Sequence, residues 1–151
     1  MTPVTAAIVE NEAELVAIAR DMHTVAVVGI KNGERDPDAP GFSVPEMMKA
    51  LGVKILGINP TIASALGEPT LRSVAELPTG VDVLDVFRRS DAIAALTDEI
   101  LALPPERRPA VVWLQSGIRD DASAARLVAG GIRVVQDHCL GVYSRRARFR
   151  R

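Results

Sequence analysis

The sequence predicts an α/β fold organised around a doubly wound parallel sheet of about five strands. Short runs of β-branched and other apolar residues recur along the chain, and segments with a helical spacing of apolar residues separate them. Each run is apolar at nearly every position, which is typical of strands covered on both faces, as in parallel sheets. Because parallel strands need crossover connections, helices are expected on both faces of the sheet, giving three layers.

The amino-terminal part predicts a helix followed by the first strand. The helix is expected over 11–22, where Asn11 serves as N-cap and Glu14 follows three positions later. The strand is expected over 24–30, in an apolar, β-branched run that reaches Gly29. The residues after this strand should therefore lie at the carboxyl edge of the sheet, where open α/β folds bind anionic ligands.

A long loop and a second helix follow the first strand. The loop over 31–41 is rich in glycine, proline and aspartate, and a loop of this length inside a domain is more often functional than not. Ser43 and Glu46 form a capping box that predicts the start of the helix, and Gly52 is placed to end it. The second strand is expected over 53–58.

Helices and strands alternate in the remainder of the chain. The expected elements are a short capped helix over 73–77 in an irregular segment 61–80, a strand over 81–87, a helix from Ser90 or Asp91 to 103, a strand over 110–114, a helix from Asp120 or Asp121 to 129, and a strand over 132–135.

The composition predicts one globular domain over 1–151, with a helix within 1–22. The 151 residues are 48% hydrophobic and 25% charged, which suits a single core. The net charge of −1 gives no field that would attract nucleic acid, so nucleic acid is not an expected partner. The single cysteine, Cys139, excludes an internal disulfide and fits a reducing compartment. No secretion leader and no apolar stretch near the ~20 residues of a membrane span is found, so a cytoplasmic protein without membrane attachment is expected.

The segment 145–151 is strongly basic, with five arginines among seven residues. One interpretation is a solvated, loose terminus, because chain ends are often poorly ordered. The other is a clamp on a phosphate or on an acidic partner.

Cations follow two of the expected strands. Lys31 follows the first strand, and Arg88 and Arg89 follow the third. Ammonium and guanidinium groups bind phosphates, so this edge predicts a ligand with several phosphates. The Gly-x-Gly-x-x-Gly pattern of dinucleotide sites is absent, the second strand ends in Asn59 instead of an acid, and no Walker sequence is present.

Five segments together resemble the family of small stand-alone CoA-binding proteins, whose domain is similar to the CoA-binding domain of the succinyl-CoA synthetase α subunit. They occur in the family's order and at its spacing, over 25–29, 57–60, 81–88, 112–117 and 134–139. The likeness spans roughly residues 24–145. It implies a Rossmann-like fold with coenzyme A or an acyl-CoA lying across the strand ends.

The resemblance also implies roles for single residues at these strand ends. They are Gly29, Ile30 and Lys31 for the phosphates, Asn59 and Pro60 for the border of the nucleotide, Phe87 and Arg88 for the adenosine or pantetheine part, and Gln115 and Gly117 for the pantetheine end. Relatives commonly have small residues after the glycine, where this chain has Ile30 and Lys31, so the approach of a phosphate is narrower here. The amides at the expected helix start, Ser43, and Arg35 in the loop are expected to complete the site.

Two further residues have more than one interpretation. Asp85 lies inside an apolar strand, so its carboxyl group must be hydrogen-bonded or paired, and support of a loop is its expected role. Cys139, beside His138, is either an inert, partly buried cysteine or a reactive thiol able to form a mixed disulfide with CoA. The spacing of histidines, cysteine and carboxylates predicts neither a metal site nor a catalytic set of residues.

The leading hypothesis is a protein that binds coenzyme A or an acyl-CoA without catalytic chemistry of its own. One alternative is a nucleotide-dependent oxidoreductase, or a ligase component that works with a separate catalytic subunit. The other is a redox or interaction module that depends on Cys139. A homo-oligomer or an unidentified protein partner is compatible with each of them.

Overall fold

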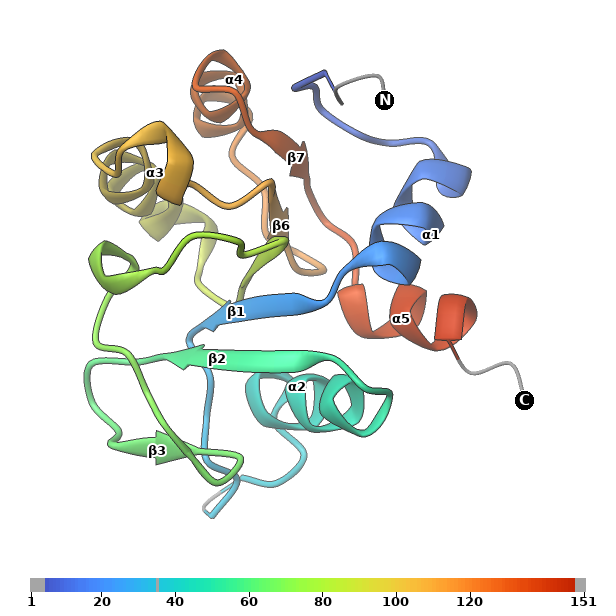
Figure 1. The fold of residues 1–151 in the computed structure, drawn as a ribbon, viewed down its shortest axis with the longest axis vertical. Helices are drawn as coiled ribbons and strands as arrows, with labels where there is room; N and C mark the ends of the chain where they lie inside the picture. The colour runs from blue at the N-terminus through green and yellow to red at the C-terminus, as the bar shows by residue number, and fades with distance from the viewer. Residues whose placement is uncertain (1–4, 35, 149–151) are drawn as a thin grey trace.

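Five parallel strands form the central sheet of the computed structural model, which describes residues 5–34 and 36–148. The strands are β1 (Thr24–Val28), β2 (Lys54–Ile58), β5 (Val83–Val86), β6 (Val111–Leu114) and β7 (Arg133–Val135). They lie in the order β2-β1-β5-β6-β7, and every neighbouring pair is parallel. The predicted α/β fold with a doubly wound parallel sheet is confirmed (Figure 1).

Helices cover both faces of this sheet (Figure 1). The longer ones are α1 (Glu12–Asp21), α2 (Pro40–Ala50), α3 (Ile93–Leu101), α4 (Asp121–Ala129) and α5 (Leu140–Arg148), and the short 3-10 turns are η1 (Val74–Glu76), η2 (Ser90–Ala92) and η3 (Pro105–Arg107). One face carries α1, α2 and α5 around a core that includes Val27 and Trp113. The other carries α3 and α4 around a core that includes Leu84 and Val112. Alternate residues of each strand enter the two cores, which explains why the strands are apolar at consecutive positions.

The chain changes direction across the middle of the sheet. After β1 it crosses to the edge strand β2, and it then returns to the other side of β1 as β5. The connections that follow β1 and β5 therefore leave the sheet in opposite directions. Open α/β sheets bind ligands in the crevice that such a switch creates at the carboxyl ends of the strands. The expected site thus lies beyond Val28 and Val86, which are paired in the register of β1 and β5.

Helix α2 begins at Pro40, so the helix start and capping box predicted at Ser43 are wrong. Proline at the first helical position breaks no hydrogen bond, because the amides of the first turn have no partner inside the helix. Pro45 lies inside α2 and leaves the Gly41 carbonyl without its usual intrahelical donor. The Lys31 amide donates to that carbonyl at 3.0 Å, which joins the loop after β1 to the first turn of α2.

The segment 61–80 is more ordered than the sequence predicts. It contains a short antiparallel hairpin of β3 (Ser64–Ala65) and β4 (Glu68–Pro69). The short helix predicted over 73–77 is one turn of 3-10 helix, η1. The predicted cap is confirmed, because Ser73 Oγ accepts a hydrogen bond from the Ala75 amide at 3.2 Å.

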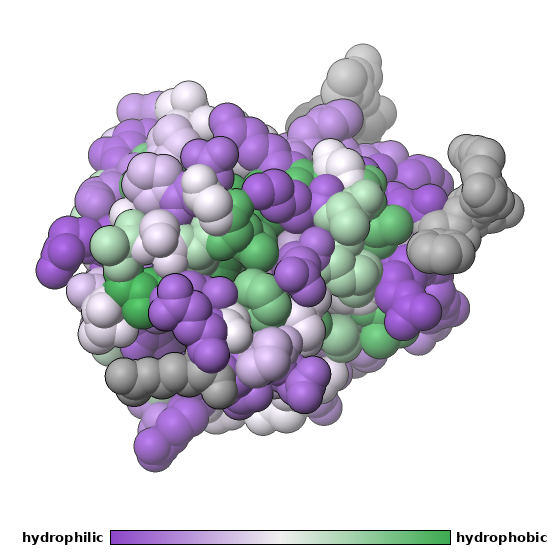
Figure 2. All heavy atoms as spheres, turned by 90° about the horizontal axis from the view of Figure 1, so that it is seen from below, coloured by the Kyte–Doolittle hydropathy of each residue, from purple (hydrophilic) through white to green (hydrophobic). Residues whose placement is uncertain are grey.

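The face of the molecule that Figure 2 shows is mainly hydrophilic. Seen from below the view of Figure 1, hydrophobic residues show as separate patches between hydrophilic ones (Figure 2). Among the large apolar side chains of the described residues, Ile8 and Val142 are exposed. In the same ranges, the longest and most apolar helices still fall short of what a membrane crossing requires.

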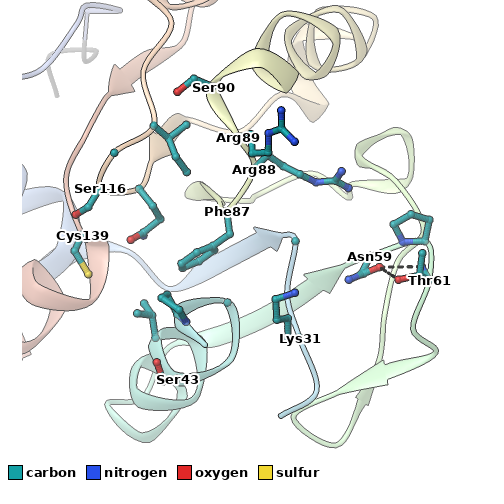
Figure 3. A pocket seen from close by; sticks show the side chains of 18 residues that line it. Lys31, Ser43, Asn59, Thr61, Phe87, Arg88, Arg89, Ser90, Ser116 and Cys139 are labelled. Atoms are coloured by element: carbon teal, nitrogen blue, oxygen red, sulfur yellow. Dashed lines mark hydrogen bonds between the residues drawn. The ribbon is translucent and has the colours of Figure 1, made fainter. Parts of the chain in front are cut away.

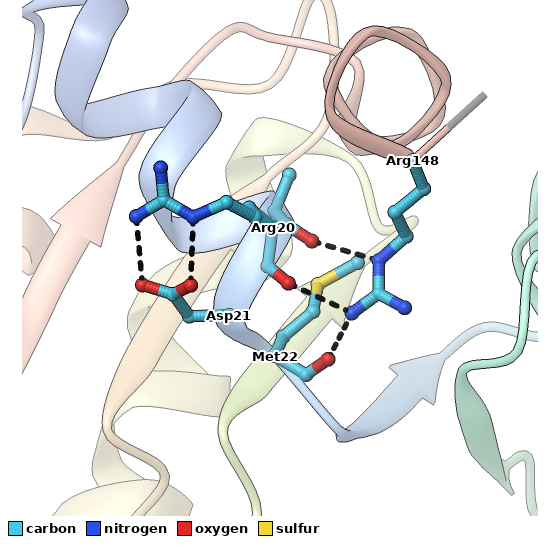
Figure 4. Close-up of polar contacts among 5 residues, drawn as sticks. Arg20, Asp21, Met22 and Arg148 are labelled. Carbon is cyan, nitrogen blue, oxygen red and sulfur yellow. Dashed lines mark hydrogen bonds and ion pairs between the residues drawn. The ribbon is translucent and has the colours of Figure 1, made fainter. Parts of the chain in front are cut away.

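The arginines near the carboxyl end belong to a helix instead of a loose tail, since 145–148 form the last turn of α5. Arg148 donates to the carbonyls of Ala19 and Arg20 at 3.0 and 3.2 Å and also to that of Met22, where α1 ends (Figure 4). An α-helix leaves the carbonyls of its last turn without intrahelical donors. Arg148 therefore caps α1 from α5, and the remaining residues of the predicted tail lie outside the described residues.

Replacing Arg148 by alanine is expected to lower the free energy of unfolding by about 1 to 2 kcal/mol, because the carbonyls at the end of α1 lose a charged donor. Replacing Arg145, which is exposed on the same helix, is expected to change it by less than about 0.5 kcal/mol. Urea unfolding followed by circular dichroism measures both values. Equal stabilities of the two variants would show that Arg148 does not fasten α1.

Candidate ligand-binding site

A pocket of about 960 Å³ opens at the carboxyl edge of the sheet (Figure 3). The residues that follow β1, β2, β5 and β6 line it, together with the first turn of α2 and the residue that precedes α5. Most residues predicted for the site lie in its wall, namely Gly29, Lys31, Ser43, Asn59, Pro60, Phe87, Arg88, Gln115, Gly117 and Cys139. The parallel topology thus brings together residues that are far apart in the sequence.

The structure does not place the other two predicted residues in this pocket. Ile30 has no exposed surface and lies directly against Gly57, so its side chain belongs to the core behind the turn. Arg35 lies outside the described residues. The pocket is also lined by residues that were not predicted as site residues, namely Pro40, Gly41, Val44, Thr61, Arg89, Ser90, Ser116 and Ile118. Pro40 and Gly41 were missed because the start of α2 was misplaced, and the others lie within two positions of predicted residues in the sequence.

Three backbone segments meet at the turn after β1. Gly29 has a φ of +85°, and a Cβ atom there would lie 2.5 Å from the carbonyl oxygen of Phe87. A Cβ atom on Gly41 would lie 2.9 Å from the carbonyl oxygen of Gly29. The absence of side chains at these two positions lets the ends of β1 and β5 and the first turn of α2 approach one another. This contact forms the floor of the pocket at the switch point of the sheet.

Asn59 connects two loops of the pocket wall next to this turn. Its Nδ2 donates to the carbonyl of Ile30 at 2.8 Å, and its Oδ1 accepts from the Thr61 amide at 2.8 Å and from Thr61 Oγ1 at 2.7 Å. The side chain therefore holds the loop after β2 against the loop after β1. An acid at this position, as in dinucleotide sites, has no N–H with which to make the first of these contacts.

The positive charges lie on one side of the pocket. Figure 3 shows Lys31 and Arg88 on the side of Asn59, with Cys139 on the opposite side and Phe87 between them. In the part of the chain that the structure describes, neither Lys31 nor Arg88 forms an ion pair. The neighbouring Arg89, in contrast, is paired with Asp91 at 2.6 Å. Lys31 and Arg88 thus remain available to neutralise an anionic ligand, and the side near Cys139 is neutral.

A buried carboxyl group lies behind the neutral side. Asp85 has no exposed surface, and Gln115 Nε2 donates to its Oδ1, as expected for a carboxyl group inside an apolar strand. Its Oδ2 has no hydrogen-bond partner among the described residues. Burial raises the pKa of Asp85 to about 7, and the hydrogen bond from Gln115 opposes that shift.

The residues of the pocket can bind a ligand by charge and hydrogen bonding. Within the described ranges, no group of three or more histidine, cysteine, aspartate or glutamate side chains is arranged to hold a metal ion. The pocket offers two cations that form no ion pair in the described part of the chain, the amino-terminal turn of α2, and a neutral region near Phe87. Such a pocket suits a long ligand that is anionic at one end and uncharged at the other.

Residues 23–145 match a family model that is described as a CoA binding domain. The match covers every strand of the sheet and all pocket residues named above. The chain belongs to this CoA binding domain family.

Individual relatives extend this comparison. The uncharacterized protein YneT of Bacillus subtilis (strain 168) is 31% identical over 132 residues, which is 87% of this chain and 93% of that protein. The structure of cell-free ID.343 from Thermus thermophilus is 37% identical with a TM-score of 0.80, covering 91% of this chain and 99% of that one. The resemblance to a family of small CoA-binding proteins with a Rossmann-like fold is therefore confirmed.

A more distant likeness concerns the fold alone. Acetyl-coenzyme A synthetase 1 of Ca. Korarchaeum cryptofilum, solved in complex with phosphate and ADP, is 21% identical with a TM-score of 0.63. The likeness covers 78% of this chain but only 26% of the synthetase. This CoA binding domain protein thus shares its fold with one part of a much larger enzyme.

Proposed function

We propose that this CoA binding domain protein binds coenzyme A or an acyl-CoA in the pocket, as a binding protein and not as a catalyst. The observation that supports the proposal most is the distribution of charge at the switch point, with Lys31 and Arg88 unpaired on one side and a neutral wall on the other. Coenzyme A has the matching distribution, because its phosphates lie at the nucleotide end and its pantetheine arm is uncharged. Membership of the family supports the choice of this ligand over other nucleotides.

The proposed contacts follow from the geometry of the wall. The diphosphate lies between Lys31 and Arg88, near the first turn of α2, where the Gly41 amide has no acceptor among the described residues and the positive end of the helix attracts negative charge. Gly29 and Gly41 let the ends of β1 and β5 and the first turn of α2 meet, and these segments form the floor under the phosphates. The pantetheine arm then runs past Phe87 toward Gln115 and Cys139. Pro40 has no N–H, and the Phe42 and Ser43 amides donate to the Ala39 carbonyl, so the amide involved is that of Gly41.

Calorimetric titration with CoA, NAD and ATP in parallel tests the proposal. We expect CoA to bind more tightly than either nucleotide, because it alone carries both a phosphorylated adenosine and a pantetheine arm. Preferential binding of NAD would favour a nucleotide-dependent oxidoreductase. Binding of none of the three would contradict a role in which the pocket holds CoA.

Replacing Arg88 by alanine is expected to weaken CoA binding about tenfold, because a charge-assisted hydrogen bond to phosphate is lost. The matched variant is Arg89→Ala, which removes the same charge from the next residue. Since Arg89 is already paired with Asp91, its loss is expected to weaken binding by no more than about threefold. Titration of both variants with CoA measures the difference, and equal losses would remove Arg88 from the proposed contacts.

Bound CoA is expected to protect Cys139 from alkylation by iodoacetamide, because the pantetheine arm covers the side of the pocket where this thiol lies. Adenosine 3′,5′-bisphosphate, which lacks that arm, is expected to leave the alkylation rate unchanged. Cys139 is the only cysteine in the sequence, so mass spectrometry of the intact protein reports on this site alone. Equal protection by both compounds would indicate that the ligand lies in the opposite orientation.

A further inference from the structure

The buried Asp85 connects to the pocket through one side chain, Gln115. Asp85 lies on β5 between Val27 of β1 and Trp113 of β6, and it has no exposed surface. Its Oδ1 accepts a hydrogen bond from Gln115 Nε2. Gln115 is only 5% exposed, yet it forms part of the pocket wall. The two side chains therefore lead from the core of the sheet to the ligand site.

The other end of the Gln115 amide is open to the pocket. No donor among the described residues bonds its Oε1. Only Asp85 Oδ2 and Thr97 Oγ1 are side-chain atoms that are both buried and without a partner in the described structure. Gln115 Oε1 therefore has some exposed surface. It faces the pocket, because Gln115 lines the pocket wall. A nearly buried acceptor without a partner in a pocket wall indicates a ligand group that donates a hydrogen bond.

We propose that Asp85 is a positioning residue that holds the Gln115 amide with its carbonyl oxygen toward the pocket, where that oxygen accepts a hydrogen bond from an amide N–H of the pantetheine arm. This inference rests on the proposed function. It names the part of the ligand that the neutral side of the pocket recognises.

Asp85 can orient Gln115 because its oxygens discriminate between the two ends of an amide. A carboxylate only accepts hydrogen bonds, so it bonds Nε2 and repels Oε1. A neutral carboxyl group that carries its proton on the unpartnered Oδ2 still accepts at Oδ1, which keeps the same orientation. Without Asp85, nothing in the hydrogen bonds described favours Oε1 over Nε2 on the pocket side. The amide can then turn its N–H groups toward the N–H of the ligand.

Replacing Asp85 by leucine removes the acceptor and tests the proposal. We expect CoA to bind about tenfold more weakly, the loss that corresponds to one hydrogen bond. Binding of adenosine 3′,5′-bisphosphate, which has no pantetheine amide, is expected to stay within about twofold of the wild type, since none of its groups contacts Gln115. The same pattern is expected of Asp85→Ala, which adds no bulk. The melting temperature of D85L is not expected to fall, because a buried carboxyl group with an unpartnered oxygen contributes little to stability.

Three controls separate positioning from a general disturbance of the fold. Asp85→Asn keeps an acceptor for Gln115 Nε2 but also carries a donor that can bond Oε1, so it is expected to bind CoA more tightly than D85L and no more tightly than the wild type. Thr97→Val removes the other buried unpartnered oxygen, on α3 away from the pocket, and is expected to leave CoA binding unchanged. In a Gln115→Leu background, which loses the contact already, Asp85→Leu is expected to have no further effect on CoA binding.

The outcomes distinguish this inference from the proposed function. If the wild type does not bind CoA, the proposed function is overturned, and the inference with it. If the wild type binds CoA but D85L and D85A bind equally well, only the inference is overturned. It is also overturned if these variants lose both ligands equally, or if D85L weakens CoA binding further in the Gln115→Leu background.

Discussion

Asp85→Asn is expected to gain stability relative to the wild type as the pH rises. The difference between their free energies of unfolding is expected to increase in favour of the variant by about 4 kcal/mol between pH 3 and pH 8. The pKa of Asp85 is raised from 3.8 to about 7 because burial disfavours the charged form. The folded protein therefore binds a proton that the unfolded chain releases between these two values. Wild-type stability falls as the pH rises through this window, and asparagine, which does not ionise, removes this loss.

Urea unfolding of both proteins over this pH range measures the difference. Most of the change is expected between about pH 4 and pH 7, the window set by the unfolded and folded pKa values. Thr97→Val serves as control, because it changes a buried polar group that does not ionise, so its effect on stability should not depend on pH. A constant difference between D85N and the wild type across the range would show that folding does not raise the pKa of Asp85.

Replacing Gly29 by alanine is expected to lower the free energy of unfolding by about 2 to 4 kcal/mol. The φ of +85° strains any residue with a Cβ atom, and that atom would lie 2.5 Å from the Phe87 carbonyl oxygen. The end of β1 must then move away from β5, which opens the floor of the pocket. CoA binding is expected to weaken in parallel, beyond what Arg88→Ala causes.

Gly80 offers the matched comparison for Gly29. It has the same φ of +85°, but a Cβ atom there would meet nothing within 4 Å. Gly80→Ala is therefore expected to cost about 1 kcal/mol of stability, from backbone strain alone, and to leave CoA binding unchanged. Urea unfolding and calorimetry of the two variants separate strain from close approach. Equal losses of stability would mean that the contact between Gly29 and Phe87 is not what requires glycine.

The sheet was predictable because burial on both faces leaves a direct mark in the sequence. Each strand falls within a mainly apolar run, and Gly29, Asn59 and Gln115 mark where three of those runs end. The parallel pairing then places these ends along one edge, so that most of the pocket wall follows from the topology. The same logic explains why the Ile30 side chain lies in the core, since an apolar residue after a strand can return to the core as easily as face a ligand.

The remaining features depend on contacts between distant segments. The pattern of Ser43 and Glu46 is a valid capping box, but Pro40 starts α2 earlier, and the Lys31 amide supplies the donor that Pro45 lacks. Helix α5 was not predicted because its last turn consists largely of arginines, and its stability comes from α1, which Arg148 caps. Local sequence does not contain these contacts, so neither feature could be read from it.

A crystal structure of the protein with bound CoA tests the central claim most directly. We expect the diphosphate between Lys31 and Arg88 at the switch point of the sheet, and a pantetheine amide within hydrogen-bond distance of Gln115 Oε1. CoA bound elsewhere on the molecule, or in this pocket with its phosphates at Cys139, would contradict the claim.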